Sequence, residues 1–169
     1  MDPQLKPISR EGVPEAINKA ELYRNLNEPG EAESICRDIL AADADNQTAL
    51  RLLGLSITDQ FNGSPGDRYR EAEKIFQTLQ DEYERKYYAG LLRERLAKAQ
   101  LEAGRSPHTV APLFEEALAY FEKAEEIRPH GNDDAILRWN RCVRILQSRL
   151  GSDWQKLIDT IDAGDSPPI

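Results

Sequence analysis

The hydrophobic residues of this chain recur at helical spacing in three separate stretches. Within each stretch the intervals are four and then three residues, which places the members on one face of an α-helix. Small members leave room for a second helix, and large members fill the space beside it. The pattern therefore predicts three closely packed helices with these faces: Ala32, Cys36 and Ile39; Ala72, Phe76 and Leu79; and Ala117, Phe121 and Ala124.

A second kind of helical stretch precedes the first kind. Ala20 and Tyr23 match Gly54 and Ile57, and the members of both matched pairs lie 34 residues apart. Two helix types therefore alternate along the chain, which is typical of a helical repeat array. No segment alternates between apolar and polar residues with a period of two, so the sequence predicts no β-strands.

Prolines, glycines and capping residues separate the helical stretches. They mark these boundaries: Pro14; Pro29 with Gly30; Asp45 with Asn46; the loop 61–67; Gly104 with Ser106 and Pro107; and the segment 129–134. The interval 83–86 contains neither glycine nor proline. Whether the fourth and fifth helices join, kink or separate there is left open by the sequence.

Charge and composition narrow the range of partners. The chain has 169 residues, enough for one domain, with 31% charged residues and a formal net charge of −8. Acidic proteins repel phosphate backbones and anionic membranes, so we expect neither nucleic acid nor a membrane as a partner. The sequence shows no secretory signal and no stretch near the roughly 20 apolar residues of a membrane span, which predicts a cytoplasmic location.

No group of residues has the spacing of an active site or a metal site. Cys36 and Cys142 lie far apart within helical patterns and are predicted to be reduced core residues. His108 and His130 each follow a proline at a loop edge, which favours ordinary loop residues over a catalytic base. The loop 61–67 has glycines near a helix start but lacks the lysine-containing ending of a phosphate-binding loop. We therefore expect no enzyme, no cofactor and no bound metal.

The chain resembles the tetratricopeptide repeat family. Two sets of residues follow that family's W-x2-L-G-x2-Y, A-x3-F and P pattern: Leu50, Leu53, Gly54, Ile57, Ala72 and Phe76; and Ala117, Phe121, Ala124 and Pro129. The resemblance implies an all-α fold, a right-handed α-solenoid of about three helix pairs with a capping helix and a short tail helix. The implied divisions are an N-terminal extension 1–12, repeats 13–46, 47–85 and 86–131, a capping helix 132–150 and a tail 151–169.

The three repeats depart from the family pattern at several positions. Ala97 takes the position that Gly54 has in the second repeat, and Phe121 is expected to fill space against the next helix. The position of the family's tryptophan holds Ala16, Leu50 and Arg93 in the three repeats. Because the second and third repeats are also long, HEAT-like helix pairs, with periods of about 40 to 47 residues, remain an alternative.

In this family the first helix of each pair lines a concave groove, so the resemblance implies a partner-binding site there. The candidate residues are Arg24, Asn25, Arg51, Leu55, Glu94, Arg95, Lys98, Asn140 and Arg144, and the same alignment adds Ile17, Asn18, Glu21, Leu52, Asp59, Leu101 and Val143. Residues 86–104 include four basic and two acidic residues, a net charge of +2, whereas residues 28–45 carry −5. We therefore expect a protein or peptide partner with acidic character. The alternative is that these cations only keep the surface soluble.

The expected function is a protein-interaction adaptor or scaffold. A chaperone's C-terminal tail is not the expected ligand, because Ile17 and Glu21 replace the Lys and Asn of the family's two-carboxylate clamp. The alternative is a self-assembling structural unit, and an enzyme is a distant third. The tail offers one apolar helical face, which either packs on the closing helix or contacts a second copy: Trp154, Leu157, Ile158 and Ile161.

Overall fold

The predicted all-α class is confirmed by a computed structural model, which describes residues 1–151, 156 and 159. Within these residues a turn of 3-10 helix, η1 (Arg10–Gly12), precedes seven α-helices, and no strand occurs. The α-helices are α1 (Val13–Asn25), α2 (Pro29–Ala42), α3 (Gln47–Asp59), α4 (Asp67–Gln77), α5 (Glu82–Glu102), α6 (Pro107–Glu126) and α7 (Asp134–Leu150).

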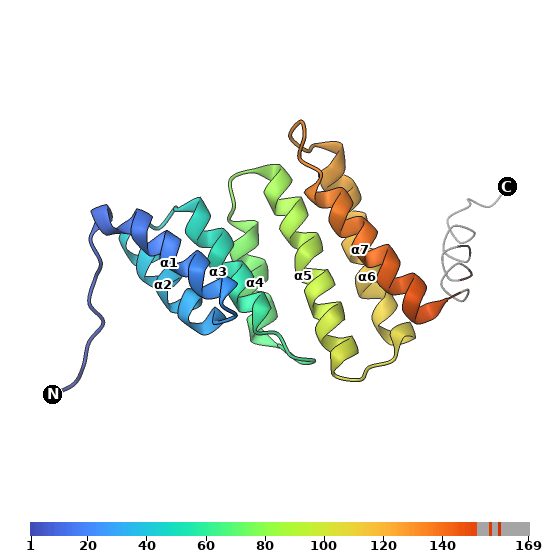
Figure 1. The fold of residues 1–169 in the computed structure, drawn as a ribbon, viewed down its shortest axis with the longest axis horizontal. Helices are drawn as coiled ribbons and strands as arrows, with labels where there is room; N and C mark the ends of the chain where they lie inside the picture. The colour runs from blue at the N-terminus through green and yellow to red at the C-terminus, as the bar shows by residue number, and fades with distance from the viewer. Residues whose placement is uncertain (152–155, 157–158, 160–169) are drawn as a thin grey trace.

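The helices succeed one another in chain order along the long axis of the molecule (Figure 1). Each helix packs mainly against its neighbours in sequence, as short connections between helices require. The odd-numbered helices make additional contacts in the order α1, α3, α5 and α7. These four helices therefore form one continuous layer of the molecule.

Polar residues and prolines set most helix ends where the sequence predicts them. The side chain of Asn46 caps α3 by accepting a hydrogen bond from the backbone nitrogen of Ala49 at 2.9 Å. Pro14, Pro29 and Pro107 lie in the first turns of α1, α2 and α6, where a missing backbone N–H costs nothing. The local sequence thus accounts for the division into helices.

The break between α4 and α5 lies earlier than the interval 83–86, which is inside α5. The side chain of Asp81 accepts a hydrogen bond from the backbone nitrogen of Tyr83 at 3.1 Å and so caps α5. A capping aspartate therefore ends the connection without glycine or proline. Helix α5 begins at Glu82, before residue 86, where the predicted third repeat starts.

Two glycines each lie under a phenylalanine ring of the following helix. A Cβ atom at Gly54 in α3 would lie 2.6 Å from Cζ of Phe76 in α4, and one at Gly90 in α5 would lie 2.7 Å from Cε1 of Phe121 in α6. A larger residue at either position would displace the ring. The same close contact therefore recurs in two successive helix pairs.

The second of these contacts differs from the predicted equivalence of Ala97 to Gly54. Gly90, rather than Ala97, makes the contact that corresponds to that of Gly54, and the ring of Phe121 lies against the preceding helix. Ala97 is also fully buried. Seven residues make about two helical turns, so Gly90 and Ala97 share a face and the hydrophobic period alone does not distinguish them.

The three predicted hydrophobic faces are confirmed as core, since none of their nine residues is more than 2% exposed. One core cluster joins α1 to α5 and a second joins α5 to α7, so α5 belongs to both. Cys36 and Cys142 are free and buried, as predicted. The predicted tail helix and its four apolar residues, Trp154, Leu157, Ile158 and Ile161, lie outside the described residues.

Candidate functional site

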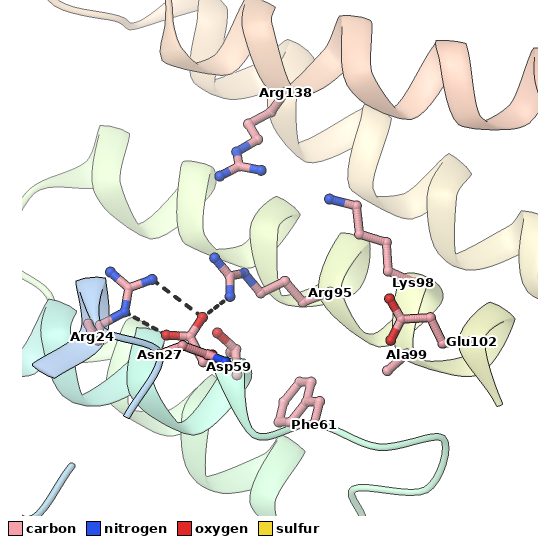
Figure 2. Close-up of a pocket in the computed structure, with 10 residues that line it drawn as sticks. Arg24, Asn27, Asp59, Phe61, Arg95, Lys98, Ala99, Glu102 and Arg138 are labelled. Atoms are coloured by element: carbon pink, nitrogen blue, oxygen red, sulfur yellow. Dashed lines mark hydrogen bonds and ion pairs between the residues drawn. The ribbon is translucent and has the colours of Figure 1, made fainter. Parts of the chain in front are cut away.

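The layer of odd-numbered helices borders a pocket of about 400 Å³, which we call the central pocket. Figure 2 shows its side chains, which come from α1, α3, α5, α7 and the adjoining loops. Four of the ten lining residues are cationic and two are acidic, in a chain whose net charge is −8. The lining residues are Arg24, Asn27, Thr58, Asp59, Phe61, Arg95, Lys98, Ala99, Glu102 and Arg138.

Asp59 joins two arginines at one side of the central pocket. Its Oδ2 accepts a hydrogen bond from Nε of Arg24 at 2.6 Å, and its Oδ1 accepts one from Nη1 of Arg95. Asp59 is the last residue of α3, where the negative end of the helix dipole disfavours a carboxylate. The two guanidinium groups offset that penalty and tie α1, α3 and α5 together.

Glu94 is a second, fully buried carboxylate beside the pocket. Its Oε1 lies 2.8 Å from Nζ of Lys98 and 3.6 Å from Nη1 of Arg138. Neither oxygen of Glu94 accepts a well-aligned hydrogen bond from the described residues. Because a buried carboxylate without hydrogen bonds depends on nearby opposite charge, Glu94 requires these two cations.

Arg138 carries a stable positive charge from α7 to the pocket. Burial opposes the charged form, but a hydrogen bond with the Tyr87 side chain and the charge of Glu94 outweigh burial, so the pKa of Arg138 is raised. Figure 2 shows its side chain extending from α7 toward Arg95. The side chain is 34% exposed, so the charged group is accessible to a ligand.

The ion pairs of the central pocket leave positive charge uncompensated. Asp59 pairs with two arginines, and Glu94 pairs with Lys98 and Arg138, so two carboxylates serve four cations. Glu102 is an exposed third carboxylate in the lining, and counting it leaves one excess positive charge instead of two. An anionic group is therefore the ligand that the pocket can accept most favourably.

Four of the nine candidate groove residues come together at the central pocket: Arg24, Glu94, Arg95 and Lys98. Arg51 instead forms an ion pair of 2.8 Å with Glu84, and Leu55 packs half-buried against the core cluster of α1 to α5. Three others do not line the pocket: Asn25, Asn140 and Arg144. Partner binding by any of the nine remains a prediction.

The sequence pattern does not predict Arg138 as a site residue. The spacing of opposite charges along the sequence does relate three other lining residues, Arg24, Asp59 and Arg95. Asp59 pairs with Arg24, 35 residues before it, and with Arg95, 36 residues after it. Opposite charges about 35 residues apart therefore indicate such pairs, although the same separation also occurs outside the pocket, between Arg37 and Glu71. Arg138 lies farther from its partner Glu94, because the third helix pair is longer than the others.

Other chemistry in the described part of the chain is limited. No three His, Cys, Asp or Glu side chains among residues 1–151, 156 and 159 are grouped as a metal site. None of the described helices combines the length and apolar character needed to cross a membrane. Burial raises the pKa of the Cys36 and Cys142 thiols to about 12, so neither supplies a thiolate near neutral pH.

Comparisons with known proteins add no family assignment. No protein-family model matches the chain, and no curated protein or solved structure matches it. The resemblance to the tetratricopeptide repeat therefore rests on the residues of this chain alone.

Proposed function

We propose that this chain is an adaptor or scaffold that binds an acidic segment of a partner protein along α1, α3, α5 and α7. The observation that carries this proposal is the excess of positive charge in the central pocket of a strongly acidic protein. Complementary charge speeds the encounter with an acidic partner and fixes how the bound segment is placed. The proposed activity is binding without catalysis, in a cytoplasmic protein.

The proposal includes a right-handed α-solenoid of the tetratricopeptide type. Its support is the recurrence of equivalent contacts, since a glycine lies under a phenylalanine ring in both α3–α4 and α5–α6. Glu94 in α5 and Arg138 in α7 lie 44 residues apart, but the ion pairs that join α1 to α3, α2 to α4 and α3 to α5 recur with sequence separations from 33 to 36 residues. These separations are closer to the tetratricopeptide period than to the roughly 40 to 47 residues of HEAT-like pairs. Repeat arrays of this kind present extended inner surfaces to their partners.

An array of immobilised peptides tests the adaptor function. The full chain is applied to matched sets of acidic, neutral and basic peptides, and we expect retention on the acidic set that weakens as salt is added. The double variant Arg95→Gln/Arg138→Gln should lose this retention, while its helical content, measured by circular dichroism, stays the same.

Lys123→Gln is the matched control, because Lys123 is an exposed cation of α6 that neither lines the pocket nor belongs to the nine candidate groove residues. Undiminished retention of the folded double variant would contradict the pocket as the binding site. If no peptide set is retained and light scattering shows a concentration-dependent dimer, the self-assembling unit replaces the adaptor.

A further inference from the structure

We propose that the central pocket binds a phosphate monoester, the side chain of a phosphorylated serine or threonine in the partner segment. This inference rests on the proposed function, because it names the group that fills the pocket of the same surface. A phosphorylated side chain carries about −1.5 to −2 charges near neutral pH and offers three acceptor oxygens. An aspartate or glutamate side chain offers one charge and two oxygens.

The charge balance of the pocket favours the more highly charged group. The four cations share Asp59 and Glu94, which leaves two positive charges among the ion pairs themselves. Glu102 lowers the excess, but its side chain is exposed and therefore screened by water and salt. One carboxylate from a partner would leave part of the excess unpaired, whereas a phosphate dianion would neutralise it.

The cations also approach the pocket from several directions. Arg95 and Lys98 extend from α5, while Arg138 extends from α7 on the opposite side (Figure 2). A planar carboxylate is matched by the fork of a single arginine. Donors that converge from different helices instead match the tetrahedral arrangement of phosphate oxygens, and arginine is the preferred partner for such groups.

Glu94 prepares two of these cations for a ligand. It is fully buried and lies 2.8 Å from Nζ of Lys98, yet its oxygens accept no well-aligned hydrogen bond from the described residues. Glu94 thus holds Lys98 and Arg138 by charge while using few of their N–H donors. A lysine has three such donors and an arginine five, so most remain for a bound phosphate.

Asp59 acts as an internal competitor for the same cations. It pairs with Arg24 and Arg95, and the three side chains are each about one-fifth exposed. A phosphate that approaches Arg95 must share that guanidinium with Asp59. Removal of the Asp59 charge should therefore strengthen phosphate binding, which a purely structural role for Asp59 does not predict.

Titration of the full, 15N-labelled chain with small probes at constant ionic strength tests this assignment. The probes are N-acetyl-phosphoserine amide, N-acetyl-glutamate amide and inorganic phosphate, and the readout is the arginine Nε–H signals in NMR spectra. We expect the phosphoserine probe to shift the Arg95 and Arg138 signals, with half-saturation at a concentration about tenfold below that of the glutamate probe.

The three probes separate the possible failures. Equal half-saturation by the phosphoserine and glutamate probes would overturn the phosphate assignment and leave the acidic-peptide function standing. Inorganic phosphate that binds as tightly as the phosphoserine probe would overturn a phosphorylated protein as the ligand and indicate a free-phosphate site. Absence of any shift at both arginines would overturn the phosphate assignment, and peptide retention on the array then decides the adaptor function separately.

Substitutions test both which cations bind the phosphate and whether Asp59 competes with it. Arg138→Gln should weaken binding of the phosphoserine probe about tenfold, and Asp59→Asn should tighten it about threefold. Lys123→Gln, the exposed control on α6, should leave it unchanged. If Asp59→Asn does not fold, Glu102→Gln removes the exposed carboxylate of the lining and should tighten binding about twofold. Weaker binding by the folded Asp59→Asn variant would overturn the competition.

Discussion

Two sets of ion pairs in this molecule differ in charge balance. The set that we call the outer cluster joins α2 to α4 through Glu33, Arg37, Arg68 and Glu71. Each of its arginines pairs with both glutamates, at distances of 2.6 to 2.9 Å, so its charges are equal and every one is paired twice. In the central pocket each cation pairs with one carboxylate, and positive charge is left over.

This difference in charge balance separates the stabilising role of the outer cluster from the binding role that we propose for the central pocket. In the outer cluster, hydrogen bonds from Arg68 outweigh burial and, together with those from Arg37 and Gln60, lower the pKa of Glu33 to about 2. A cluster that satisfies its own charges has little to offer a ligand. The central pocket keeps cations that its own carboxylates do not neutralise, and such cations are available to an external anion.

The largest expected effect comes from moving α4, which carries half of the outer cluster and none of the pocket lining. Gly54→Leu would force a side chain against Phe76, a ring that is 2% exposed and stacked on Tyr88 at 4.8 Å. We expect this overpacking to lower the free energy of unfolding by about 3 kcal/mol and to separate α4 from α3. Urea denaturation measures the loss.

Gly30→Leu is the control for this substitution. A Cβ atom at Gly30, in the first turn of α2, would meet nothing within 4 Å. Its unfolding free energy should stay within about 0.5 kcal/mol of the unsubstituted chain, as for other surface changes. Equal losses in the two variants would contradict the close approach of α3 and α4.

The second effect compares one cation from each set. Lys98→Met removes the nearest cation from fully buried Glu94, and we expect a loss of about 2 kcal/mol because a buried carboxylate is left poorly compensated. Arg37→Met should cost less than about 0.5 kcal/mol, because Arg37 is 46% exposed and Arg68 still pairs with both glutamates. Chemical denaturation of both variants checks the order, and the opposite order would refute the distinction between the sets.

The spacing of the hydrophobic residues predicts which helix faces are buried, but it does not predict which residues on those faces contact each other. It places Ala117, Phe121 and Ala124 correctly in the core, because burial of a helix face requires only the right spacing. The hydrophobic period cannot show which residue along that face makes a given contact, because residues seven positions apart lie about two turns apart on the same face. The prediction of Ala97, seven residues after Gly90, as the equivalent of Gly54 is a shift of this kind.

The candidate site is less predictable because it depends on contacts between distant segments. The family resemblance implies Arg24, Arg95 and Lys98 as groove positions, and all three lie in the layer of odd-numbered helices. The role of Asp59 as the common partner of Arg24 and Arg95, and the approach of Arg138 from α7, depend on how far each pair of helices is displaced from the preceding pair. Side-chain periodicity within one helix contains no information about that displacement.

A smaller effect should appear when the outer cluster is titrated with acid. The pKa of Glu33 is lowered from 4.5 to about 2 in the folded chain, so its contribution to stability is complete above pH 4.5 and lost as the pH falls toward 2. Glu33→Gln should lower the free energy of unfolding by about 1 kcal/mol near neutral pH and reduce its decline over that interval. Urea denaturation at several pH values measures both.

Glu31→Gln provides the comparison for the acid titration. Glu31 is an exposed carboxylate of the same helix, and no ion pair within the described residues involves it. Its variant should follow the pH dependence of the unsubstituted chain. If Glu33→Gln follows it equally well, the outer cluster does not stabilise the fold through Glu33.

The smallest expected effect distinguishes the two sets of ion pairs by their response to an added anion. Replacing chloride with inorganic phosphate at about 10 mM and equal ionic strength should raise the melting temperature by about 1 °C, because a weakly bound ligand stabilises the folded chain through mass action. Arg37→Gln should keep the increase, because the paired charges of the outer cluster leave no excess positive charge to bind an anion, whereas Arg138→Gln should abolish it. Differential scanning calorimetry of the three chains resolves the change. An increase that survives Arg138→Gln and disappears in Arg37→Gln would assign anion binding to the outer cluster, and the charge balance would then fail to identify the site.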